Sequence, residues 1–230
     1  MIQGISPTYP YRRVYNYFQF GNVDEIQKKV LFYLMDLPSA GYTPPNDNDY
    51  PRTRLKKLLY WDDPKPLEKA LPTAAQMRSI YFDPGLPDKP SDEAKGYRIF
   101  PQPLVTQAQT QGQTILRCYM GPVYPYSGNR MSSFEVQATV CFEALSNTSL
   151  ESNSRTDALS RTYSMMCAVV DALNGVNIDG VGSFYFDRTQ NTYCGAMPIN
   201  DESTNVGYRF YLGLTLAGGN TDDDQYDELR

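Results

Sequence analysis

The sequence of 230 residues contains no histidine. This absence excludes a Ser-His-Asp or Cys-His nucleophile system, a histidine general base and any metal site that needs an imidazole ligand. Phosphate-binding loops are missing as well, because neither G-x-x-x-x-G-K-[ST] nor G-x-G-x-x-G occurs. The commonest routes to catalysis are closed, and we expect a protein that is not an enzyme.

Long apolar stretches are also missing. No run approaches the roughly 18 apolar residues that a membrane-spanning helix needs, and residues 1–13 lack the apolar core of a secretion signal. We therefore expect a chain that is made in a cytoplasm and has no membrane partner.

Positive charge is scarce outside one short cluster. The net charge is −5, and residues 221–230 alone carry five acidic side chains against one arginine. The rest of the chain is close to neutral, so it offers no broad basic surface for the phosphates of DNA. Asp222, Asp223 and Asp224 lack the glycine and glutamate of a calcium loop, and we interpret this end as a solvated acidic tail.

Paired cysteines are absent too. More than 20 residues separate each cysteine from the next, and no C-x-x-C pair occurs among Cys118, Cys141, Cys167 and Cys194. This spacing argues against zinc, iron–sulfur and redox sites and favours buried free thiols. We expect no metal and no cofactor.

Two amphipathic helices are predicted. The first covers residues 22–37, with Asn22 as its N-cap, and ends before a proline. The second covers residues 154–173, with Ser154 as its N-cap, and a glycine follows it. Both carry apolar stripes of the kind that cover a sheet.

A proline-rich stretch separates these helices from each other. Residues 38–103 hold 12 of the 17 prolines, so only short helices fit, around residues 55–60 and from a Thr73 cap through Ile80. We expect this insertion to be ordered and to serve a contact. Its basic residues are interpreted as the solvated side of a short helix rather than a nucleic-acid contact: Arg52, Arg54, Lys56 and Lys57.

Strands dominate the second half. Residues 132–147 alternate strictly, with an apolar side and a polar side that includes Glu135, Gln137, Thr139 and Glu143. Residues 205–218 repeat this pattern, and weaker strands are expected at residues 97–104, 114–120 and 183–188. Residues 121–130 have the composition of an extended hairpin loop.

The order of these elements predicts an α+β fold in two layers, with a mainly antiparallel or mixed sheet and helices on one face. We expect one domain over residues 1–220, with residues 38–103 inserted in it and an acidic tail at 221–230. The second face of the sheet is left without a cover from its own chain.

Two groups of side chains are candidates for contacts. The polar faces of the two long strands are expected to face a channel lumen or a neighbouring subunit, through Glu135, Gln137, Thr139, Glu143 and Arg209. Tyrosine-rich and tryptophan-bearing loops are candidates for partner contacts, through Tyr124, Tyr126, Tyr60 and Trp61, because amphipathic rings suit protein interfaces.

Enzymatic and sugar-binding alternatives remain open. Glu135 and Glu143 lie eight residues apart on one strand, or about 26 Å at roughly 3.3 Å per residue, too far to flank one glycosidic bond. Asp62 and Asp63 are adjacent in a proline-rich turn, which is typical of solvated loop residues. The 19 tyrosines also suit stacking on sugars.

The order of helix, strands, helix and strands resembles the tail terminator and head-to-tail joining proteins of tailed bacteriophages. The resemblance rests on residues 22–37, on "TILRCYM" and "SFEVQATVCFEAL", on residues 154–173 and on "RFYLGLTLAG". It covers about two-thirds of the chain and is one of pattern, without a diagnostic motif. The proline-rich stretch departs from the compact members of that family.

The resemblance implies a structural virion protein of the tail or neck, assembled in the host cytoplasm. Its copies would form a ring, a homohexamer, that ends tail polymerisation. The implied partners are other copies of the chain, the tail tube protein and the head-tail connector or portal-side proteins, while DNA passes without specific binding. The main alternative is a carbohydrate- or receptor-binding module of a virion appendage, and a histidine-free carboxylate hydrolase is a third.

Overall fold

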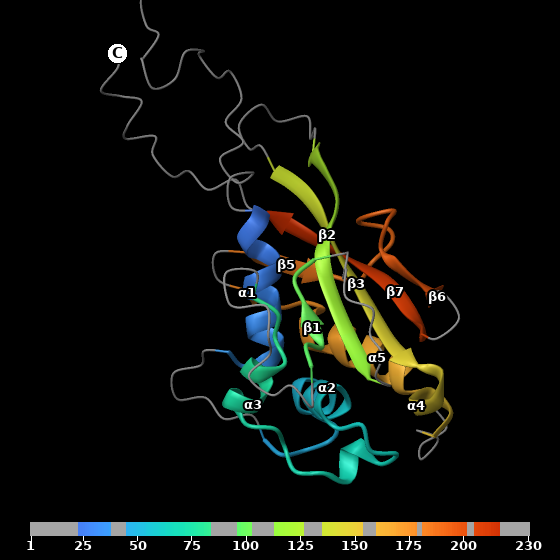
Figure 1. Cartoon of the computed structure of the whole chain (residues 1–230). Coiled ribbons are helices and arrows are strands. Elements are labelled where there is room, and N and C mark those ends of the chain that lie inside the picture. Colours follow the sequence, from blue (N-terminus) through green and yellow to red (C-terminus); the bar gives the residue numbers. More distant parts are fainter. Residues whose placement is uncertain are drawn as a thin grey trace, which may run out of the picture.

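The computed structural model of the protein describes residues 23–37, 45–83, 96–102, 113–126, 135–153, 160–178, 181–201 and 205–216. Within them the chain forms an α+β fold, a curled mixed sheet with its helices on one side, as the sequence predicts (Figure 1). The acidic tail at residues 221–230 lies outside the described residues.

The sheet has the strand order β1-β2-β3-β7-β5-β4, and β6 pairs with β7 beside β5. The strands are β1 Ile99–Phe100, β2 Thr114–Tyr126, β3 Glu135–Asn147, β4 Asn177–Ile178, β5 Gly182–Tyr185, β6 Gly195–Asp201 and β7 Asn205–Leu216. β1 pairs with β2 in parallel, whereas the other pairs are antiparallel. The helices are α1 Val23–Met35, α2 Pro51–Tyr60, α3 Ala74–Ser79, α4 Thr148–Asn153 and α5 Arg161–Leu173, with a short 3-10 helix at Pro66–Glu68.

The two long alternating strands lie side by side at the centre of the sheet. β3 and β7 pair from Val136↔Leu216 to Asn147↔Asn205, and the rings of Phe142 and Phe210 stack on the helix-covered face with centroids 5.4 Å apart. α5 packs against both strands, while α1 and α2 pack against β2. The expected apolar side therefore forms the core, as the period-2 pattern predicts.

The hairpin of β2 and β3 is longer than the sequence suggests. β2 continues to Tyr126, so the loop predicted from residue 121 begins too early. The pairing slips between Met120 and Val123, where a bulge absorbs Gly121 and Pro122. A proline within an edge-like stretch indicates a loop from sequence, but a bulge can accommodate it within a strand.

The second long helix starts later than predicted. α5 begins at Arg161, and Ser160 caps it by accepting a hydrogen bond from the Tyr163 backbone at 3.0 Å. Ser160 has an extended backbone, which separates α5 from α4. The predicted cap at Ser154 lies outside the described residues.

The proline-rich stretch is part of the core. The predicted capping box of Thr73 and Gln76 is present at α3, and Leu55, Leu59 and Met77 are fully buried in the same apolar cluster as the sheet. The prediction that this stretch packs on the rest of the chain is confirmed for its described residues.

Helix α1 ends in an unusual way. Asp36 has a left-handed backbone with φ 54°, the Leu37 amide bonds to the Phe32 carbonyl at 2.8 Å, and the Asp36 amide bonds to the Tyr33 carbonyl at 3.3 Å. This is the Schellman arrangement, which usually has glycine at the left-handed position. Aspartate tolerates that geometry better than most residues.

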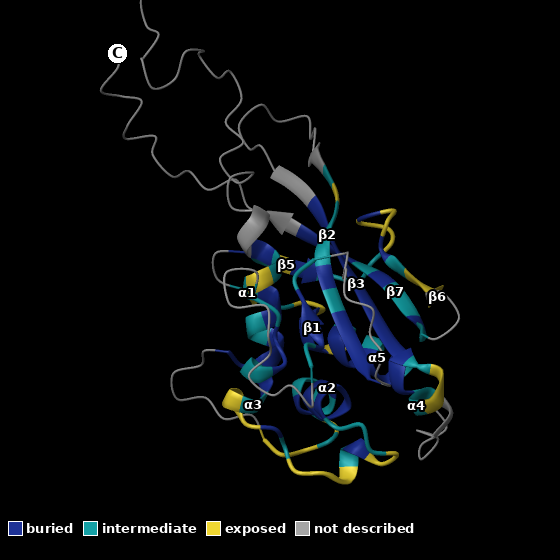
Figure 2. Ribbon diagram, viewed as in Figure 1, coloured by how far each residue is buried: buried dark blue, intermediate teal, exposed yellow. Residues whose placement is uncertain are grey.

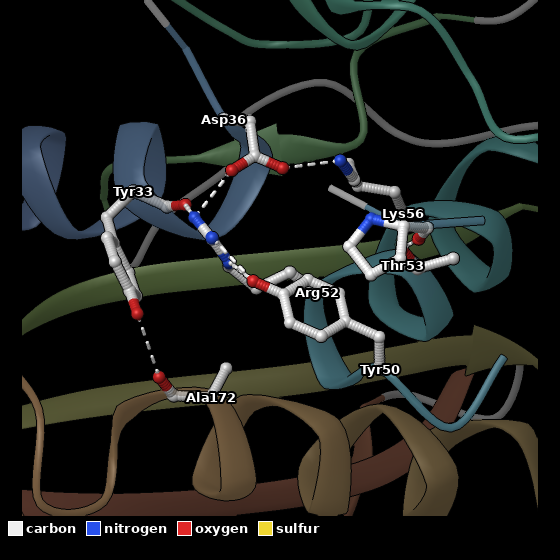
Figure 3. A network of polar contacts seen from close by, with 8 residues as sticks. Tyr33, Asp36, Tyr50, Arg52, Thr53, Lys56 and Ala172 are labelled. Carbon is white, nitrogen blue, oxygen red and sulfur yellow. Dashed lines mark hydrogen bonds and ion pairs between the residues drawn. The ribbon is translucent and has the colours of Figure 1, made fainter. Parts of the chain in front are cut away.

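The Asp36 carboxylate joins α1 to α2 (Figure 3). Arg52 and Lys56, both on α2, each approach one of its oxygens at 2.5 Å. Arg52 also donates to the Tyr33 carbonyl at 3.0 Å. The two basic side chains thus connect the end of α1 to the first half of α2.

The solvated interpretation of the basic cluster is therefore wrong. Lys56 and Lys57 are buried, and Lys57 donates to the Asn48 side chain at 2.8 Å and to the Leu67 carbonyl at 3.2 Å. Arg54 donates to Ser164 of α5 at 3.3 Å. The partners of these cations lie outside the cluster itself, so the local sequence does not show them.

Two buried arginines hold the carboxyl end of α2. Arg98 donates to the carbonyls of Leu59 and Tyr60 at 2.9 and 3.2 Å and forms an ion pair with Asp62. Asp62 lies in a loop with its side chain 32% exposed, and it is in addition the ion-pair partner of this arginine.

Arg161, at the first turn of α5, completes the same end of α2. It donates to the carbonyls of Leu58, Trp61 and Asp63 at 3.0, 2.8 and 2.6 Å and to the Thr114 hydroxyl at 3.1 Å. The last carbonyls of a helix have no partner within the helix and must find one elsewhere. In α2, the last carbonyls accept hydrogen bonds from Arg98, which directly precedes β1, and from Arg161 of α5.

We predict that Asp36→Asn lowers the free energy of unfolding by about 3 kcal/mol, because it leaves two buried cations without their counter-charge. Asparagine keeps the size of the side chain and also tolerates the left-handed backbone, so the change isolates the charge. Urea unfolding monitored by circular dichroism measures the loss. Asp171→Asn, at an exposed aspartate of α5, is the matched control and should change the value by less than about 0.5 kcal/mol. Equal effects of the two variants would contradict this role of Asp36.

Candidate functional site

The face of the sheet opposite the helices is the candidate site, and we call it the outer face. Side chains from β2, β3 and β7 form two rows across it. The arginine row consists of Arg117, Glu143 and Arg209, and the tyrosine row consists of Tyr119, Cys141 and Tyr211. The rows are symmetric about β3, because strands in register place like positions side by side.

The arginine row is closely hydrogen-bonded. Glu143 accepts from Arg117 Nη1 at 3.1 Å through Oε2, and from Arg209 Nε and the Tyr119 hydroxyl, both at 2.8 Å, through Oε1. Glu143 is only 2% exposed, whereas the Arg209 side chain remains 39% exposed. The hydrogen bond to Glu143 raises the pKa of Arg209, although partial burial acts against it. Two guanidinium groups of the arginine row thus share the buried Glu143 carboxylate.

The tyrosine row stays protonated at neutral pH in the folded state. Burial raises the pKa of Cys141 to about 11, with hydrogen bonds to Tyr119 and Tyr211 acting in the opposite direction. Burial also raises the pKa of Tyr119 and of Tyr211. The row is a neutral strip of phenol and thiol groups beside the charged arginine row.

The remaining part of the outer face is closed by the chain itself. Thr139 is fully buried and donates to the Pro122 carbonyl at 2.9 Å, at the bulge of β2. A Cβ at Gly213 would lie 2.2 Å from the Tyr185 ring, so this ring rests directly on the glycine backbone. Only glycine leaves room for this ring at that position.

The predicted polar face of β3 is thus not the open surface that the sequence suggests. Thr139 and Glu143 are buried by side chains of the neighbouring strands, and of the predicted residues Arg209 alone is shown with substantial exposure. Glu135 and Gln137 belong to β3, but their side chains lie outside the described residues. No helix of the described residues covers this face, as predicted, whereas its exposed residues differ from the predicted ones.

The residues predicted to form partner-contact loops also lie in different surroundings from those predicted. Tyr60 is buried in the core and cannot meet a partner, and Trp61 is half-buried, with Nε1 donating to the Ala70 carbonyl at 2.9 Å. Tyr124 and Tyr126 belong to β2, and their side chains lie outside the described residues.

Strand β6 provides the most exposed apolar surface of the described residues, and the sequence did not predict it. Met197 in β6 is 48% exposed, and Tyr193, two residues before the strand, is 51% exposed. Within the described part of the chain β6 pairs with β7 on one side only. Figure 2 shows exposed positions at β6 beside the buried central strands.

The signal for β6 in the sequence is weak. Seven residues with a central proline, "GAMPIND", show no sustained alternation. Pro198 is nevertheless consistent with an edge strand, because proline cannot donate to a neighbouring strand. We call the surface made by Tyr193, Met197 and the free side of β6 the β6 surface.

The thiols fit the expectation in three of four positions. Cys118, Cys141 and Cys194 are buried free cysteines, while Cys167 on α5 is half-exposed. In the described residues, no three acidic, cysteine or histidine side chains gather closely enough to hold a metal ion.

The sequence matches no family model and no curated protein. None of the helices in the described part of the chain is both long enough and apolar enough to cross a bilayer.

We predict that the protein loses stability as the pH rises above about 9, because the folded state holds its buried protons more tightly than the unfolded chain does. A thiol has a pKa of about 8.5 in an unfolded chain, and Cys141 titrates near 11 in the fold. The contribution of Cys141 to the free energy of unfolding is complete below the pKa of the thiol in the unfolded chain. It is lost as the pH rises toward the pKa of the thiol in the folded state. Urea midpoints between pH 8 and 11 measure this slope.

Cys141→Ala should make that alkaline slope shallower, whereas Cys167→Ala, at the half-exposed thiol of α5, should change it less. An identical slope in the wild type and in Cys141→Ala would show that this thiol does not contribute.

Proposed function

We propose that the protein is a structural subunit of a bacteriophage tail or neck. Copies of the chain close into a ring, a homohexamer, at the end of the tail tube. The ring stops polymerisation of the tube protein and presents a different surface to the head-tail connector. The order of helices and strands that carries the family resemblance agrees with the described fold.

The observation that carries the proposal is the β6 surface. It combines an edge strand with two large apolar side chains, Tyr193 and Met197, that are about half exposed. Exposed edges of this kind invite pairing or docking by another chain. Tyrosine and methionine are also among the residues enriched in protein interfaces.

The occupant that we propose for the β6 surface is a second copy of the chain. A contact between the β6 surface of one copy and a different surface of the next is heterologous, and such contacts close into rings when the rotation allows it. The helix-covered side of the sheet is already occupied by α1, α2 and α5. Neighbour contacts are therefore expected on the side of β6.

Passage of DNA is consistent with the charge of the described surface. Arg52, Lys56 and Lys57 are held by partners inside the fold and do not form a basic surface. A channel that lets DNA slide should not bind its phosphates tightly. We therefore expect DNA to pass without specific binding.

A carbohydrate- or receptor-binding module is the second candidate. The phenol rings of Tyr119 and Tyr211 on the outer face favour it, because flat rings suit stacking on sugars. Glycan-array binding by a monomer would support this candidate and contradict the ring.

Native mass spectrometry of the purified protein, with negative-stain images of the same sample, tests the ring directly. Addition of the tail tube protein then tests termination. We expect a closed oligomer with a central opening, which caps tubes and stops their growth. A protein that stays monomeric with and without tubes would contradict the proposal.

We predict that Met197→Glu shifts the native mass distribution from the ring toward the monomer, by at least about tenfold in the assembly constant, because a charge is buried without a partner at the contact. Ala75→Glu places the same charge on an exposed position of α3 and is the matched control. Thermal unfolding of both monomers should agree, since both sites are exposed. A ring that tolerates Met197→Glu as well as Ala75→Glu would remove the β6 surface from the contact.

A further inference from the structure

Arg209 extends the β6 surface with a charged group. It lies opposite Met197 in the antiparallel pair of β7 and β6, so both side chains stand on the same face of the sheet. Side chains at opposite positions of this kind have Cβ atoms about 5 Å apart. Met197 is 48% exposed, and the Arg209 side chain is 39% exposed. A chain that docks on Met197 therefore also meets the guanidinium group of Arg209.

This guanidinium group is held in a fixed orientation. Nε of Arg209 donates to Oε1 of Glu143 at 2.8 Å, and Nη2 forms an ion pair with the same oxygen at 2.6 Å. Glu143 is in turn buried and accepts hydrogen bonds from Arg117 and Tyr119 of β2. A side chain that is already ordered loses less conformational entropy when a partner binds to it.

One edge of the Arg209 side chain is left for a partner. Arginine has five N–H donors, and the contacts with Glu143 use the edge that carries Nε and Nη2. Within the described part of the chain, Nη1 of Arg209 has no hydrogen-bond partner. Guanidinium groups bind carboxylates with two parallel, charge-assisted hydrogen bonds. A carboxylate that approaches Nη1 and Nη2 from the solvent is the ligand that this edge favours.

We propose that Arg209 binds a carboxylate of the neighbouring copy at the β6 surface. This inference rests on the proposed ring, because it concerns the same contact between copies. Each copy is rich in acceptors for such a bond, with 26 acidic side chains against 21 basic ones. Met197 supplies apolar contact area, whereas the charge-assisted bond fixes the position of the partner and disfavours chains without a carboxylate there.

Two variants separate this contact from the support of Glu143. Arg209→Gln should lower the assembly constant in native mass spectrometry at least about tenfold, because the carboxylate of the neighbouring copy loses its partner. Arg117→Gln also removes a guanidinium group from Glu143, but it lies on β2, on the far side of β3 from β6. We expect a clearly smaller loss from Arg117→Gln. Circular dichroism confirms that each variant is folded.

Cross-linking identifies the carboxylate. Arg209→Lys keeps the charge and places an amine at the same position, and a carbodiimide joins an amine directly to a carboxylate that it contacts. Rings are assembled from an equal mixture of chains labelled with light and heavy nitrogen, so that mass spectrometry separates links between copies from links within one chain. We expect a link from the introduced amine to an aspartate or glutamate of the other copy.

Two results would overturn the inference and leave the ring in place. The first is an equal loss of assembly in Arg209→Gln and Arg117→Gln, which would assign to Arg209 only the support of Glu143. The second is a ring in which the amine of Arg209→Lys forms no link between copies. A protein that stays monomeric would contradict the proposed function and the inference together.

Discussion

The carboxyl end of α2 is the point on which the rest of the fold depends. Arg98 and Arg161 come from two later segments of the chain, and both donate to its last carbonyls inside the core. Burial lowers the pKa of Arg161, which shows the cost of removing this charge from water. Several hydrogen bonds and nearby carboxylates offset that cost. These contacts join the proline-rich stretch to the start of α5 and to Arg98, the residue before β1. Together these segments form one packed layer on the helix-covered face of the sheet.

This layer explains why one face of the sheet is free. With α1, α2 and α5 held together on the same side, no described helix covers the outer face. On that face, Arg117 of β2 and Arg209 of β7 lie in register with Glu143 of the central strand and hydrogen-bond to its buried carboxylate. What remains accessible lies toward β7 and β6, where Arg209 and Met197 are opposite each other in register. The described part of the chain thus presents a preordered strand edge at β6.

The sequence predicted those elements whose signals involve only a few neighbouring residues. Alternation identified β3 and β7, and the Thr73–Gln76 box identified α3, because these signals act over a few residues. The burial of Lys56 could not be predicted, since its partner Asp36 belongs to another helix. The burial of Glu143 depends on the register of three strands, which one strand's sequence does not contain. β6 is short and carries a proline, so its pairing with β7 is a tertiary effect.

The central claim is that a second copy covers the β6 surface, and hydroxyl-radical footprinting tests it most directly. Met197 and Tyr193 are both reactive side chains and about half exposed in the single chain. Their oxidation rates should be compared in dissociated and assembled protein, with the half-buried Met166 of α5 as an internal reference. The account predicts strong protection of Met197 and Tyr193 on assembly, with Met166 unchanged. Equal oxidation of Met197 and Tyr193 in the two states would contradict it.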